Sequence, residues 1–144
     1  MIVPDVNLIL YATFRDSADH QPALAWWTNL LNGRDPVGLS MTTLFGFIRL
    51  STNPRIMHGA LPVDDALSRV ESWLARPQVE LLQPGPRHLQ IAFDLLRAAG
   101  TGANLTSDAQ LAAFTIENQA ELHSADTDFA RFPGLRWVKP LKRR

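Results

Sequence analysis

Four aspartates lie in or next to apolar segments of the chain: Asp5, Asp108, Asp126 and Asp128. Ionised carboxylates are rarely buried without a partner. If the fold brought these four together, they would repel one another, and their pKa values would rise unless a cation lay between them. Mg²⁺ and Mn²⁺ prefer oxygen ligands and would relieve this repulsion. Such a site can activate water for the hydrolysis of a phosphodiester.

Each of these acids also has a structural interpretation. Asp5 could be tied to a nearby backbone group or cation. Asp108 could interact favourably with the dipole of the helix that it begins. Asp126 could cap a short helix over residues 127–131, in which Asp128 would be a solvated acid of the first turn.

Three further polar residues are candidates for contact with a substrate or with the acids: Asn7, Arg49 and Asn53. Asn7 could form a turn or donate a hydrogen bond to Asp5, and the residues alone leave both open. Arg49 could pair with an acid, bind a phosphate with two nitrogens, or lie with its aliphatic stem on the core. Asn53 could cap a helix or form a turn.

The elements that must position these residues alternate along the chain. Apolar patterns predict strands over residues 2–4, 37–40, 79–82, 121–124 and 135–138. Helices are expected over residues 8–12, 22–31, 42–50, 62–77, 87–99 and 108–118. This alternation predicts parallel βαβ units and a three-layer α/β fold with a central parallel sheet. Ligands of such sheets bind beyond the carboxyl ends of the strands, where Asp5 and Asp126 follow the first and fourth strands.

Two helices carry more detailed expectations. Ser107 and Gln110 have the spacing of a capping box, which predicts Ser107 as the residue that caps the last long helix. In the helix over residues 87–99, the spacing of Leu89, Phe93 and Leu96 predicts that these three side chains face the core.

Length and composition bound the remaining possibilities. The 144 residues predict one domain over residues 1–138, followed by a basic tail over residues 139–144. Lys and Arg number 14, as do Asp and Glu, so the whole chain has no net attraction to nucleic acid. There is no cysteine, which excludes disulfides and thiolate metal sites. With neither a membrane span nor a signal peptide in the pattern, a cytoplasmic protein is expected.

Three segments resemble the PIN-domain ribonucleases, and most of all the VapC toxins of type II toxin–antitoxin systems. They are VPDVNLILYA (3–12), FIRLSTNPRI (47–56) and SDAQLAAFTIENQAELHSADTDFARFPGLRW (107–137). The resemblance implies an α/β/α sandwich and an endoribonuclease that depends on Mg²⁺ or Mn²⁺, cleaves RNA and inhibits translation. It also implies a homodimer and a cognate, VapB-like antitoxin that blocks the site.

By motif, the resemblance implies that Asp5, Asp108 and Asp126 are catalytic, and that Asp128 joins them in holding the metal. One departure is clear. The family usually has a glutamate on the helix after the second strand, whereas this chain has no acid between Asp35 and Asp64.

Gly46 or a near neighbour stands where that glutamate is expected, and Arg49 follows three positions after Gly46. The missing carboxylate motivates an alternative, namely a catalytically weak PIN domain that binds RNA or a partner protein. A phosphatase with an aspartate nucleophile is disfavoured, because Asn7 stands where such enzymes need a second acid.

Overall fold

The central sheet of the protein contains five parallel strands, and the computed structural model describes residues 1–141 around it. The strands are β1 (Ile2–Pro4), β2 (Val37–Leu39), β3 (Val79–Leu81), β4 (Glu121–His123) and β5 (Trp137–Val138). Their order in the sheet is β3-β2-β1-β4-β5, and every neighbouring pair is parallel. The predicted parallel sheet is therefore confirmed. Residues 142–144, which belong to the predicted basic tail, lie outside the described residues.

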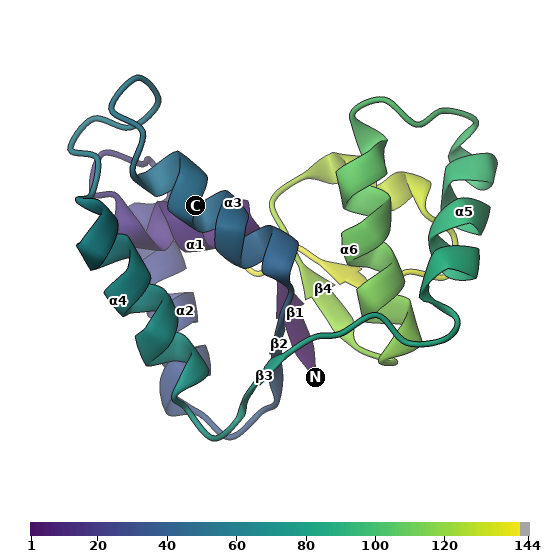
Figure 1. The fold of residues 1–144 in the computed structure, drawn as a ribbon, viewed down its shortest axis with the longest axis horizontal. Helices are drawn as coiled ribbons and strands as arrows, with labels where there is room; N and C mark the ends of the chain where they lie inside the picture. Colours follow the sequence, from purple (N-terminus) through teal and green to yellow (C-terminus); the bar gives the residue numbers. More distant parts are fainter. Residues whose placement is uncertain (142–144) are drawn as a thin grey trace.

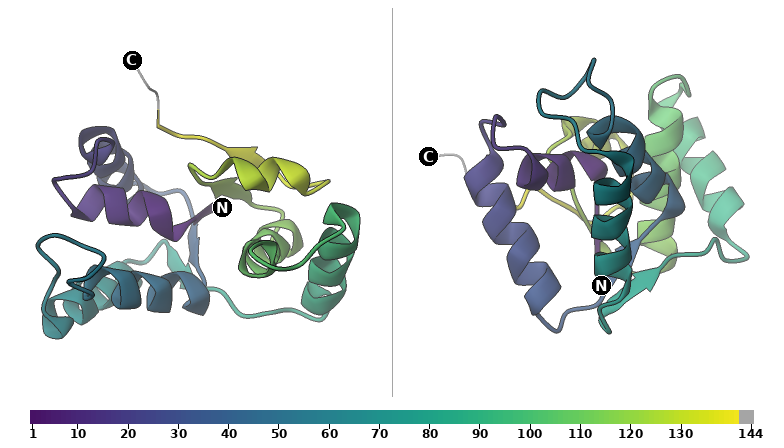
Figure 2. Two further views of the ribbon diagram at one scale, coloured as in Figure 1. Left: turned by 90° about the horizontal axis from the view of Figure 1, so that it is seen from above. Right: turned by 60° about the vertical axis from the view of Figure 1, so that its left-hand side comes forward.

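Helices cover both faces of this sheet (Figure 1). Their bounds are α1 (Val6–Thr13), α2 (His20–Asn32), α3 (Met41–Ser51), α4 (Val63–Leu74), α5 (His88–Ala99) and α6 (Leu105–Glu117). Figures 1 and 2 show α1 to α4 on one side of the sheet and α5 and α6 on the other, which confirms the three-layer α/β/α architecture. None of the helices within residues 1–141 is both long and apolar enough to cross a bilayer.

The order in which strands are added to the sheet changes direction on the two sides of β1. The strands β1, β2 and β3 follow one another toward one edge, and β4 then lies on the opposite side of β1. The register pairs Pro4 with His123, so β1 and β4 end side by side. In parallel α/β sheets this reversal leaves a crevice at the carboxyl ends of the two strands. The residues that follow β1 and β4 therefore meet there.

The start of α6 differs from the capping-box prediction. The helix begins at Leu105, before Ser107, and its N-cap residue Asn104 makes no hydrogen bond with its side chain. The backbone N–H of Leu105 donates to Gly102 instead, so the preceding turn already directs the chain into the helix. Leu105 is also buried and anchors this first turn. Asp108 consequently lies inside the first turn of α6.

The prediction that Leu89, Phe93 and Leu96 of α5 all face the core is wrong for two of them. Leu89 is 66% exposed and Phe93 is 48% exposed. A second apolar stripe of the same helix, formed by Ile91, Ala92 and Leu95, packs into the core instead. The outer stripe borders a groove of about 650 Å³, here called the α3–α5 groove, which is lined by Met41, Leu89, Phe93, Leu96 and ten other residues.

Candidate active site

Asp5 is held rigidly between the end of β1 and the start of α1. Pro4 ends the strand, and Asp5 caps the helix by accepting a hydrogen bond from the backbone N–H of Val6 at 2.7 Å from Oδ1. Its own backbone N–H donates to the carbonyl oxygen of His123 on β4 at 2.9 Å. The structural interpretation, in which Asp5 is tied to a nearby backbone group, is therefore correct, yet this leaves its second oxygen, Oδ2, for other contacts.

Ser124 makes that second contact and links the two strand ends. Its hydroxyl, which is fully buried, donates to Oδ2 of Asp5 at 2.7 Å and accepts a hydrogen bond from the backbone N–H of Asp126 at 3.0 Å. The amide Nδ2 of Asn7 donates to the same hydroxyl at 3.4 Å. Sequence reasoning missed Ser124. The sequence carries no signal for it, because only the register, which pairs Pro4 with His123, places Ser124 opposite Asp5.

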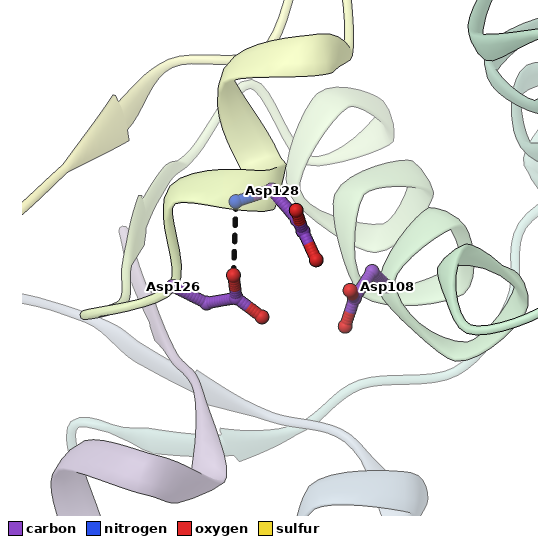
Figure 3. A group of neighbouring side chains, drawn as sticks. All are labelled: Asp108, Asp126 and Asp128. Carbon is purple, nitrogen blue, oxygen red and sulfur yellow. Dashed lines mark hydrogen bonds between the residues drawn. The ribbon is translucent and has the colours of Figure 1, made fainter.

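Asp108, Asp126 and Asp128 converge from two elements, as Figure 3 shows. Each offers a carboxylate oxygen, and these oxygens lie within 4.8 Å of one another. Asp126 caps the short 3-10 helix η1 (Thr127–Arg131), as its structural interpretation had it, and its Oδ1 accepts from the backbone N–H of Asp128 at 2.9 Å. Asp128 is exposed in the first turn of η1, while Asp108 is partly buried and reaches them from α6.

Asp5 is not one of these three clustered acids, but it is electrostatically coupled to them. Burial raises the pKa of Asp5, while hydrogen bonds from Ser124 and Val6 lower it and the charge of Asp126 raises it further. Burial raises the pKa of Asp108 to about 6, with further contributions from Asp126, Asp5 and Asp128. The four acids therefore repel one another across one small region.

This donor set fits a hard divalent cation. All the candidate ligands are carboxylate oxygens, which Mg²⁺ and Mn²⁺ prefer, and three of them are already within reach of a single ion. The mutual repulsion that raises the pKa of Asp108 is the interaction that such an ion would reverse. The residues present thus fit a metal, and Asp108, Asp126 and Asp128 would hold it, with Asp5 beside them.

A pocket of about 400 Å³ extends from the acids to α3, and Asp5 and Asp108 line it. The α3 wall of this pocket includes Thr42, Gly46 and Arg49. Arg49 is exposed, and within the described part of the chain its guanidinium makes none of the salt bridges. The pairing of Arg49 with an acid, which the sequence left open, is therefore not observed.

The two asparagines lie in different surroundings. Asn7 is inside α1 and donates to Ser124, so it contacts Asp5 only through that hydroxyl. Asn53 follows α3, where its Oδ1 accepts from the backbone N–H of Arg55 at 3.0 Å and closes a turn. Asn53 does not line the pocket with the acids. Its geometry thus supports the turn interpretation.

Known proteins resemble this chain in both sequence and fold. The family model described as "PIN domain" matches residues 2–135. Ribonuclease VapC33 of Mycobacterium tuberculosis is 50% identical over 142 residues, which cover 99% of each chain.

Two solved structures share the fold. One is VapBC2 from Rickettsia felis bound to a DNA fragment from their promoter, with a TM-score of 0.68, 17% identity and coverage of 96% of this chain and 98% of that one. The other is a toxin–antitoxin complex from Klebsiella pneumoniae, with a TM-score of 0.62, 17% identity and coverage of 99% and 100%. By its family match and its full-length similarity, the chain belongs to the PIN domain family and, within it, to the VapC ribonucleases.

Proposed function

We propose that this protein is the toxin of a toxin–antitoxin pair and that it cleaves RNA in the cytoplasm with a bound Mg²⁺ or Mn²⁺, thereby inhibiting translation. One observation carries the proposal: Asp108, Asp126 and Asp128 present oxygens within 4.8 Å of one another, beside a pocket that Asp5 also lines. The family of the chain supports the choice of RNA, since VapC33 is named a ribonuclease.

The residues of the pocket have distinct tasks in this reaction. When bound, the ion activates water and stabilises negative charge on phosphoryl oxygens. Asp108, Asp126 and Asp128 would hold the ion, and Asp5 would add its negative charge from a rigid position at the end of β1. The side chain of Arg49 lines the pocket on the opposite side, where it can contact the RNA backbone.

Two protein partners belong to the proposal. The first is a cognate antitoxin, which the toxin–antitoxin complex from Klebsiella pneumoniae with the same fold supports. The second is another copy of the chain. The exposed side chains of Leu89 and Phe93 beside the α3–α5 groove support a homodimer, because an apolar surface of this kind is commonly covered by protein.

The proposal is tested by an RNase assay with Mn²⁺ on Asp5→Asn and Asp108→Asn. We expect both changes to reduce cleavage by on the order of 100-fold or more, because direct ligands and their neighbours control metal affinity. The matched control is Asp65→Asn, which removes an exposed acid of α4 and should cleave like the wild type. Cleavage by Asp5→Asn and Asp108→Asn as fast as by the control contradicts the proposal.

A specific observation favours a second candidate, a PIN domain that binds RNA or a partner protein without cleaving it. The α3 wall of the pocket carries Thr42, Gly46 and Arg49 and no carboxylate, which leaves fewer protein ligands for an ion. This alternative predicts RNA binding that EDTA does not weaken, and no cleavage with either Mg²⁺ or Mn²⁺.

A further inference from the structure

The acidic pocket is chemically asymmetric. Carboxylates enter it from the end of β1 and from α6, with those of η1 adjacent, whereas α3 contributes Thr42, Gly46 and Arg49 among its lining residues. Among the described residues that line the pocket from α3, the only charged side chain is therefore that of Arg49, a cation. An anion in the pocket would be repelled by Asp5 and Asp108 and attracted by Arg49.

Gly46 lies in the middle of α3, where glycine destabilises a helix relative to alanine. Neither backbone nor packing requires a glycine here. Gly46 does not have a positive φ, and a Cβ atom would meet only Cγ2 of Val6, at an ordinary contact distance of 3.8 Å. What the glycine does is leave space between α3 and the residue that follows Asp5.

Arg49 lines the same pocket three residues later, about one helical turn from Gly46. Its guanidinium makes no salt bridge within residues 1–141. The positive charge is therefore not engaged by an ion pair with any of the acids. A guanidinium offers a planar fork of N–H donors that matches the oxygens of a phosphate.

We propose that Gly46 keeps the α3 side of the acidic pocket open for a phosphodiester group of the RNA and that Arg49 binds this phosphate. The inference rests on the proposed nuclease function and names the residues that admit and hold its substrate. The inference accounts for three features of the α3 wall of the pocket. These are the open space beside Gly46, the presence of a helix-destabilising glycine, and an arginine that makes none of the salt bridges within residues 1–141.

The first test measures the binding of a short, labelled single-stranded RNA by fluorescence anisotropy over a series of salt concentrations, with Ca²⁺ in place of Mg²⁺ to slow cleavage. Loss of one phosphate contact in Arg49→Gln should reduce the slope of log K against log salt by about 0.7. Arg34→Gln is the matched control. Arg34 is also exposed but precedes β2, at the opposite end of the sheet, and its loss should leave the slope unchanged.

The second test uses Gly46→Ala, which fills the space with one methyl group. We expect an undiminished melting temperature, unchanged affinity for Mn²⁺ by electron paramagnetic resonance, and an increase in KM for RNA of about 10-fold, the loss of one charge-assisted contact.

The outcomes separate this inference from the proposed function. If Arg49→Gln keeps the salt slope of the wild type, or Gly46→Ala keeps its KM while the wild type cleaves RNA, the inference is overturned and the nuclease function stands. If the wild type fails to cleave RNA both when Mg²⁺ is supplied and when Mn²⁺ is supplied, the nuclease function is overturned. The inference, which rests on that function, is then overturned as well.

Discussion

Ser124 uses all the hydrogen-bonding capacity of its hydroxyl at the centre of the site. A hydroxyl has one donor and two acceptor positions. Here the donor is directed to Asp5, and the acceptor positions receive the backbone N–H of Asp126 and the amide of Asn7. Because the group is fully buried, water cannot replace a lost bond without rearrangement. Ser124 thus fixes Asp5 and the loop that carries Asp126 relative to each other.

We expect Ser124→Ala to weaken Mn²⁺ binding by about 10-fold, the typical effect of removing a residue that orients a ligand. Titration followed by electron paramagnetic resonance measures this affinity without any cleavage. Ser124→Thr retains the hydroxyl and should restore most of the affinity. The matched control is Ser51→Ala, since Ser51 is equally buried and its hydroxyl has no partner among residues 1–141. Equal Mn²⁺ affinities for Ser124→Ala and Ser51→Ala would show that the hydroxyl does not position the acids.

The pKa of Asp108 predicts how the stability of the metal-free protein depends on pH. The pKa is raised from 3.8 to about 6, so the folded state binds this proton more tightly than the unfolded state. The ionised carboxylate therefore destabilises the fold in full above pH 6, and this penalty is lost as the pH falls toward 3.8.

We accordingly expect Asp108→Asn to raise the melting temperature of the metal-free protein above pH 6, and to have little effect near pH 3.8. Thermal unfolding in the presence of EDTA measures this. Saturating Mn²⁺ should reverse the order, because only the wild type gains the full binding free energy. A melting temperature of Asp108→Asn that exceeds the wild type by the same amount at both pH values would contradict the assignment.

The sequence predicted the acids of the site more completely than the residues that support them. Asp5, Asp126 and Asp128 could be placed because they follow apolar strands, and the carboxyl ends of parallel strands share one edge. Ser124 could not be placed in this way, because its role depends on the register between β1 and β4. The sequence pattern also could not decide which of the two apolar stripes of α5 faces the core. The prediction for Leu89 and Phe93, whose side chains are exposed, was wrong for that reason.

At the scale of elements, α5 and α6 are joined by one carboxylate. Glu117, at the end of α6, accepts hydrogen bonds from the backbone N–H groups of Gly85 and Arg87 at 2.8 and 2.9 Å. Both donors lie just before α5, where the first N–H groups of a helix have no partner within the helix. The carboxylate therefore determines how the chain enters the helix that carries Leu89 and Phe93.

Replacement of Glu117 by alanine should lower the free energy of unfolding by about 1–3 kcal/mol, because the partly buried N–H group of Gly85 and the exposed N–H group of Arg87 both lose a charged acceptor. Urea denaturation followed by circular dichroism measures this change. Glu71→Ala removes an exposed acid of α4 and should stay within about 0.5 kcal/mol of the wild type. If both variants unfold at the same urea concentration, the contact of Glu117 contributes nothing to stability.

At the scale of the whole molecule, the α3–α5 groove predicts how two copies would meet. A stable interface usually buries about 800 Å² on each partner, so the groove and the helices around it would both have to take part. We expect sedimentation velocity to show a dimer for the wild type and a monomer for Phe93→Glu, which places a charge on this surface.

The control for this prediction is Leu24→Glu, which changes a side chain of α2 that is 41% exposed and lies outside the groove. It should sediment as the wild type does. A wild type that sediments as a monomer overturns the proposed homodimer, and a dimer that survives in Phe93→Glu but not in Leu24→Glu moves the interface to α2.

The order of the strands also determines when the site can form as the chain is made. β1 emerges from the ribosome well before its neighbour β4 and before the acids from Asp108 to Asp128. A nascent chain that ends before β4 has Asp5 and Asp108 but lacks Ser124, Asp126 and Asp128. The proposed nuclease is therefore inert until β4 and the acids after it have been synthesised, and the ribosome that produces it is not exposed to its activity before then.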